Sequence, residues 1–182
     1  MRGCGNLIKF IQRNWILFLF LLPFSLSAQN VAMMGDQAIT TAEFVWVFKK
    51  NNLKRAKPDQ SQISDYLQRY IDFRLKVLDA LSLGLDKDTA YVREVEAFEK
   101  ILRTRLRSKS KQEVEFVLNE YRSGVLMFNV SERKIWAPGY GDQATTVEQT
   151  EQRERDWVAE LRKRFPVRVN EVELGRLSSQ KW

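Results

Sequence analysis

The sequence predicts a mainly α-helical fold with a small β-hairpin that is completed by a C-terminal strand. Apolar residues recur at spacings of three and four over residues 60–82, which is typical of the buried face of a long helix. Helix-capping and helix-stop signals divide much of the remaining chain into further helices. Two short extended segments, 31–40 and 167–169, lie near opposite ends of the chain. Because an isolated hairpin is marginal in water, we expect the second segment to pair with the first.

Residues 1–28 have the pattern of a secretory signal peptide, which predicts cleavage before Gln29 and export from the cytoplasm. Cations without any acid precede an unbroken apolar run over 15–22, and small residues follow up to Ala28. The alternative is a retained membrane anchor. The apolar run is shorter than the ~20 residues that span a bilayer and ends at Pro23, so we favour cleavage.

The first helices are predicted from their caps. Residues 31–40 form two extended pieces around a Gly35-Asp36 turn. Thr40 and Glu43 fit a capping box, so we expect a helix from there to about residue 52. After a polar loop over 51–58, a second helix runs from about residue 60 to 82. We expect Gly84 to end this helix by adopting a left-handed backbone conformation.

A third helix is expected from a cap at Asp86 or Asp88 to about residue 108. It ends in a basic run, which we interpret as a solvated helix end favoured by the helix dipole. Residues 113–121 are predicted as helix, with Tyr121 on its inner face. The segment 124–130 fits a buried helix or a strand, and we favour the helix. A loop over 137–142, a helix over about 145–164, a strand over 167–169 and a final turn capped by Asn170 complete the chain. The predicted seam of the third helix is Tyr91, Val95, Phe98, Leu102 and Leu106.

The composition excludes several classes of enzyme. The chain has no histidine, and its one cysteine, Cys4, lies in the predicted signal peptide. Histidine-based triads, imidazole zinc sites and thiol chemistry are therefore excluded after cleavage. Carboxylate, Ser/Thr, Lys or Tyr chemistry stays open, but no phosphate loop, nucleophile elbow or calcium loop is present. The sequence predicts a protein that is not an enzyme, with no cofactor and no metal site.

Aromatic and methionine residues are abundant, with five Trp, five Tyr, eleven Phe and four Met. Most must belong to the core, but a small helical protein cannot bury every face of every helix. Exposed aromatic patches are typical of surfaces that bind polypeptides. The candidates for such a surface are Trp46, Tyr70, Phe73, Met127, Phe128 and Trp136.

Three segments resemble the SurA-type periplasmic chaperones, which belong with the PpiC/parvulin peptidyl-prolyl isomerases, in the version found in Bacteroidetes-type bacteria. The most specific is YIDFRLKVLDALSLGLD at residues 70–86. The segments EYRSGVLMFNVSERKIW at 120–136 and DWVAELRKRFPVRVNEVELGRL at 156–177 resemble the tail of those proteins. The resemblance implies a periplasmic protein whose segments 30–110 and 113–177 pack together as one helical chaperone-like domain, 29–182.

The chain departs from the family where the parvulin domains would lie. Residues 108–112 join the two halves directly, and the histidines that line a parvulin active site are absent. No catalytic residue of the family can be carried over. The resemblance thus implies a chaperone core without its catalytic insert, binding unfolded or outer-membrane polypeptides.

Three functions follow as hypotheses. The first is a non-catalytic periplasmic chaperone, or holdase. The second is a structural subunit of an outer-membrane assembly or secretion complex, which would hold one partner. The third is a peptidyl-prolyl cis-trans isomerase, which the family label suggests and the missing histidines disfavour. The basic run lacks interleaved aromatic residues, and with export predicted we expect no nucleic-acid partner.

Overall fold

The computed structural model describes residues 29–52, 58–136 and 146–179. The predicted signal peptide and the predicted loop over 137–142 lie outside these residues. In chain order, the described elements are β1 (Asn30–Met34), β2 (Gln37–Thr40), α1 (Thr41–Asn51), α2 (Gln60–Ser82), the 3-10 turn η1 (Leu85–Lys87), α3 (Thr89–Arg105), α4 (Lys111–Ser131), the π-helical turn η2 (Glu132–Trp136), α5 (Val147–Arg164), β3 (Val167–Val169) and α6 (Glu171–Ser179). The predicted mainly α-helical class is confirmed.

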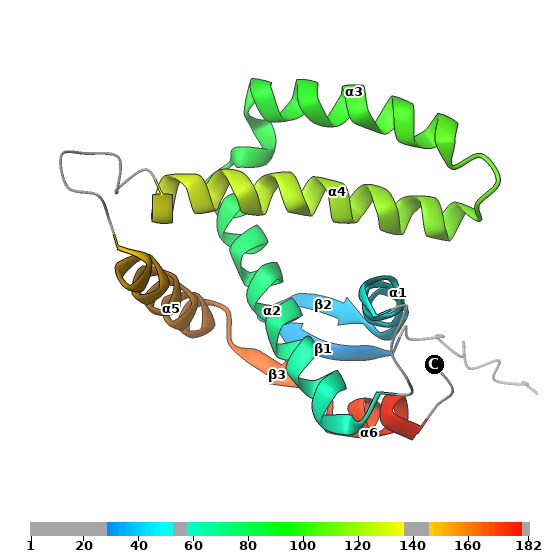
Figure 1. Cartoon of the computed structure of the whole chain (residues 1–182), viewed down its shortest axis with the longest axis vertical. Helices are drawn as coiled ribbons and strands as arrows, with labels where there is room; N and C mark the ends of the chain where they lie inside the picture. The colour runs from blue at the N-terminus through cyan, green and yellow to red at the C-terminus, as the bar shows by residue number, and fades with distance from the viewer. Residues whose placement is uncertain (1–28, 53–57, 137–145, 180–182) are drawn as a thin grey trace, which may run out of the picture.

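The two ends of the described chain meet in one small sheet. Its strand order is β2-β1-β3, and both pairings are antiparallel (Figure 1). Gly35 makes the hairpin turn with a φ of 57°, a conformation that glycine adopts without steric cost. Beyond β3, the backbone N–H of Asn170 donates to the carbonyl of Val31 at 2.9 Å. The prediction that the C-terminal strand completes the hairpin is confirmed.

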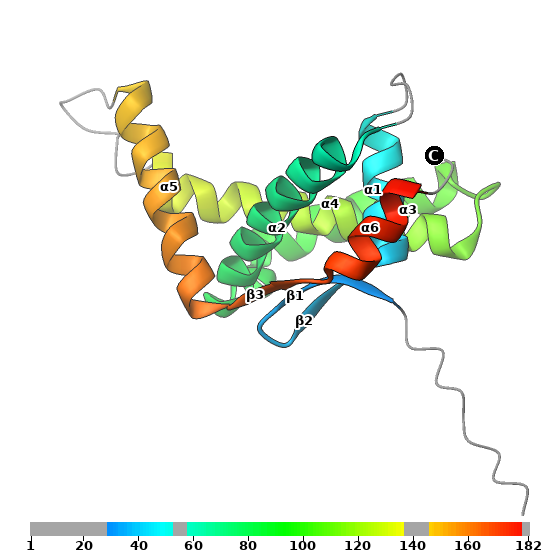
Figure 2. The same cartoon turned by 90° about the horizontal axis from the view of Figure 1, so that it is seen from below.

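Helix α2 is the central element of the core. Four of its fully buried residues recur at a spacing of four: Ile63, Leu67, Ile71 and Leu75. One end of α2 packs on α6 and β1, and the other end meets α4, which crosses it, while α5 lies along its side (Figures 1 and 2). Gly84 then reverses the chain with a φ of 70°, as predicted, and Leu85 is buried directly after it.

Most of the observed helix caps agree with those predicted from the sequence. The hydroxyl of Thr40 accepts from the backbone N–H of Glu43 at 3.2 Å, which is one half of the predicted capping box. The other half is not made, because the Glu43 carboxylate accepts from Tyr70 and Arg74 of α2 instead. Asp88, rather than Asp86, caps α3, and α3 ends at Arg105, earlier than expected.

Helices α3 and α4 form an antiparallel hairpin, in which α3 lies on the side of α4 that faces away from the sheet (Figure 1). The segment 124–130 is helical and continuous with α4, so the favoured alternative is confirmed. Helix α3 packs mainly on α4 and η1, which leaves much of its surface exposed. Among the described helices, none combines the length and apolar character needed to cross a bilayer.

Candidate functional site

An open groove runs between α3 and α4, with a volume of about 550 Å³. We call it the α3–α4 groove. Inside it the rings of Phe98 and Tyr121 stack with their centroids 4.2 Å apart, and the Tyr121 hydroxyl donates to Glu94 at 3.1 Å. The groove is therefore an aromatic surface with carboxylates at its edge. Its lining residues are Glu94, Phe98, Leu102, Val117, Glu120, Tyr121, Gly124, Val125, Phe128 and Asn129.

An exposed aromatic pair extends this groove at the C-terminal end of α4. Phe128 lines the groove, and the Trp136 ring meets the Phe128 ring edge to face, with centroids 5.2 Å apart. The exposed fractions of Phe128 and Trp136 are 53% and 39%. Trp136 is held there by η2, a π-helical turn, and such turns recur at functional sites. Large apolar side chains exposed side by side are typical of an interaction surface.

A second, narrower cleft of about 350 Å³ lies between α1, α2 and α4, and we call it the inner cleft. The ring of Trp46 lies 5.5 Å from Phe116, and that of Tyr70 lies 5.9 Å from Phe73. Each of these four side chains is half-buried and already packed on its neighbour. The inner cleft is also more enclosed than the α3–α4 groove, and polar side chains make up more of its lining.

Polar contacts also hold side chains of the inner cleft in place. The carboxylate of Glu43 accepts from the Tyr70 hydroxyl at 2.6 Å and pairs with Arg74. Burial, and then the nearby charge of Glu43, raise the pKa of the Tyr70 hydroxyl far above its usual range. Tyr70 therefore stays a neutral hydrogen-bond donor. A ligand entering this cleft would have to displace or desolvate these contacts, which costs free energy.

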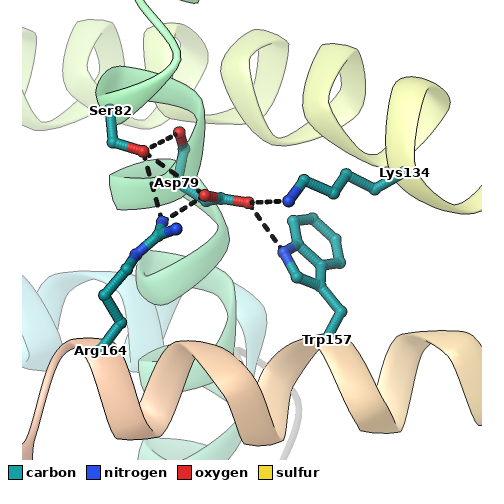
Figure 3. Close-up of polar contacts among 5 residues, drawn as sticks. All are labelled: Asp79, Ser82, Lys134, Trp157 and Arg164. Carbon is teal, nitrogen blue, oxygen red and sulfur yellow. Dashed lines mark hydrogen bonds and ion pairs between the residues drawn. The ribbon is translucent and has the colours of Figure 1, made fainter.

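A buried carboxylate holds α5 and η2 against α2. Asp79 of α2 has no exposed side-chain surface and accepts from Trp157 Nε1 at 2.8 Å (Figure 3). Lys134 Nζ of η2 lies 3.3 Å from the same carboxylate, and Arg164 of α5 pairs with its other oxygen. Because Lys134 lies two residues before Trp136, these contacts also help to position the exposed aromatic pair.

The ionisation of Asp79 follows from its partners. Burial acts to raise the pKa of the carboxyl group, but the hydrogen bonds from Arg164 and Trp157 and the charge of Lys134 act in the opposite direction and prevail. The pKa of Asp79 is therefore lower than usual, and the carboxylate is charged at neutral pH.

Five of the six polypeptide-binding candidates lie at one or the other of the two clefts. Trp46, Tyr70 and Phe73 line the inner cleft. Phe128 and Trp136 form the exposed pair beside the α3–α4 groove. The sixth candidate, Met127 of α4, is half-buried against the core, and its sulfur accepts from the Ser131 hydroxyl at 3.4 Å.

Two groove residues were missed as candidates because the sequence predicted that they face inward. Phe98 belongs to the predicted packing seam of the third helix, and Tyr121 to the predicted inner face of the next helix. The seam does pack at Tyr91 and Val95, which are buried. Further along, α4 is the main described element that packs on α3, and Phe98 is 36% exposed. The narrowness of the seam was the available signal, since one apolar stripe can cover only one neighbouring helix.

No group of His, Cys, Asp or Glu side chains within the described ranges is arranged to hold a metal ion. No protein-family model, curated protein or solved structure matches the chain in the comparisons.

Proposed function

We propose that this protein is a non-catalytic periplasmic chaperone that binds unfolded, aromatic-rich polypeptides, such as outer-membrane proteins in transit. One observation carries the proposal: the α3–α4 groove is lined by aromatic side chains and continues into the exposed Phe128–Trp136 pair. The resemblance of residues 70–86, 120–136 and 156–177 to SurA-type chaperones supports the same function.

The dimensions of the groove suit short extended segments. On α4 its lining residues run from Val117 to Asn129, which corresponds to about 18 Å at a rise of 1.5 Å per residue. An extended chain rises about 3.3 Å per residue, so about five residues fit along this length. A site of this length recognises side-chain character rather than a long sequence, as a chaperone with many clients requires.

The expected affinity is moderate. An aromatic side chain buries about 150–250 Å², and apolar burial contributes about 25 cal/mol per Å². Two client side chains would thus contribute on the order of 10 kcal/mol, and the association cost of at least ~4 kcal/mol opposes this. The difference corresponds to a dissociation constant in the micromolar range or weaker. Binding of this strength allows clients to be released without ATP hydrolysis.

The proposal predicts that the chain from Gln29 to Trp182 suppresses aggregation of an unfolded membrane β-barrel protein, measured by light scattering after dilution from urea. The double variant Phe128→Ser/Trp136→Ser should lose most of this activity, because it removes the exposed aromatic pair. Its melting temperature should change little, since both side chains are exposed. The matched control is Val147→Ser/Val172→Ser, which removes two exposed apolar side chains outside the groove and should retain activity.

Two results would contradict the proposal. Equal suppression by both double variants would mean that the aromatic pair does not bind the client. Capture of one stoichiometric partner from periplasmic extract, with no effect on aggregation, would favour the structural subunit of an assembly complex. A proline-peptide assay tests the third hypothesis, and we expect no acceleration of isomerisation.

A further inference from the structure

Positive charge is concentrated at the end of α3, in the turn that follows it and at the start of α4. Residues 100–112 include six cations and no acid: Lys100, Arg103, Arg105, Arg107, Lys109 and Lys111. We call this segment the basic tip. In Figures 1 and 2 it lies at the opposite end of the α3–α4 hairpin from α5, where the hairpin projects away from the other elements. We propose that the basic tip docks the protein on an anionic phospholipid surface.

Ion pairing within the described residues uses only part of this charge. Arg103 pairs with Glu115 at 3.0 Å and lies 3.8 Å from Glu99, and Lys109 lies 3.7 Å from Glu113. No ion pair to a described acid is made by Arg105, Arg107 or Lys111. These three exposed cations are available to an external anion.

Helix stability explains only some of the cations. The dipole of α3 favours Arg103 and Arg105 in its last turn. Lys111, however, is the first residue of α4, after the Ser110 cap, where the dipole disfavours positive charge. A cation at this position costs folding free energy, so the basic run extends beyond what the helix ends require.

An apolar residue lies among the cations, which favours lipid over other anions. Ile101 is 46% exposed, and on α3 it shares a helix face with Phe98 and Arg105 at spacings of three and four. Apolar side chains beside Lys and Arg are typical of helices that lie in the membrane interface. The basic tip has no aromatic side chain on which a nucleic-acid base could stack, so single-stranded nucleic acid fits it less well.

The test is co-sedimentation of the chain from Gln29 to Trp182 with lipid vesicles. This chain contains every described element and omits the apolar segment 15–22, which would itself partition into lipid. We expect binding to vesicles of phosphatidylcholine and phosphatidylglycerol in equal parts, and little binding to phosphatidylcholine alone. Salt at about 1 M, where the Debye length is about 3 Å, should abolish the binding.

The deciding variant is Arg105→Gln/Arg107→Gln/Lys111→Gln. Each Lys or Arg near an anionic membrane contributes about tenfold or less to partitioning, so the triple variant should bind about 100-fold more weakly. Its melting temperature should change little, because loss of Lys111, which is unfavourable at the start of α4, offsets loss of Arg105, which the dipole of α3 favours. The control Lys49→Gln/Lys163→Gln/Arg168→Gln removes the same charge from exposed positions elsewhere and should bind within about threefold of the parent chain.

Three outcomes would overturn the inference: equal weakening by the two triple variants, equal binding to neutral and anionic vesicles, or tighter binding to an RNA oligonucleotide than to anionic vesicles. The inference does not rest on the proposed function, since the Phe128→Ser/Trp136→Ser variant keeps every cation of the basic tip. Failure of either proposal therefore leaves the other testable.

Discussion

Asp79 is a charged side chain in the apolar core, and its partners explain why the core tolerates it. Trp157, Arg164 and Lys134 approach its carboxylate from α5 and η2, so both oxygens are hydrogen-bonded or ion-paired. A buried charge without partners costs several kcal/mol, whereas a fully paired one fixes the relative positions of the elements that supply the partners.

Asp79→Asn should therefore destabilise the protein by about 3 kcal/mol at pH 7, measured by urea unfolding. This lies at the low end for a broken buried ion pair, because Arg164 and Lys134 stay partly in contact with water. The control Asp72→Asn changes another carboxylate of α2. It breaks a more exposed contact, with Arg162 of α5, and should cost less than about 1 kcal/mol. Equal losses in the two variants would contradict this account.

The pKa of Asp79 also gives this residue a pH signature. Its pKa is lower in the folded protein than the unfolded value of about 3.9, so its contribution to stability is fully present above about pH 4. That contribution is lost as the pH falls through the folded-state pKa. The difference in stability between the parent chain and Asp79→Asn should consequently shrink in acid.

At the scale of the elements, α4 is one continuous helix although it contains Gly124. No described atom lies within 4 Å of the position that a Cβ would take at Gly124. Gly124→Ala should therefore stabilise the protein by about 0.5–1 kcal/mol, because glycine is a poor residue in a helix interior. The matched substitution Gly84→Ala should destabilise by about 1 kcal/mol, since the φ of Gly84 is 70°. Thermal unfolding of both variants tests this, and a destabilised Gly124→Ala would contradict the structure of α4.

The elements that local signals determine were predicted well from the sequence. Gly84 and the apolar spacing of 60–82 depend on residues close together in the chain, and the structure has both the stop and the helix there. Glu43 illustrates the limit of such signals. Its spacing from Thr40 predicts a capping box, but its carboxylate pairs with Arg74, 31 residues away. The Asp79 cluster joins residues up to 85 positions apart, so no local pattern could reveal it.

At the scale of the whole molecule, the sheet joins segments from the two ends of the described chain, and the α3–α4 hairpin lies apart from it (Figure 1). The sequence predicted the pairing of the ends because two short strands lacked partners. It identified Phe128 and Trp136 as candidates, but not the groove beside them. Whether an amphipathic face is covered depends on how many helices pack around it, and the sequence does not report this number for α3.

Site-specific photo-crosslinking tests the central claim, client binding at the α3–α4 groove, most directly. Benzoylphenylalanine replaces Phe128 in one variant and Val147, an exposed residue of α5 outside the groove, in a matched variant. Each is irradiated with an unfolded membrane β-barrel protein and with the same protein already folded. The account predicts strong adducts from position 128 with the unfolded client, weak adducts from position 147, and none with the folded client. Equal adducts from the two positions, or adducts that do not depend on unfolding of the client, would contradict it.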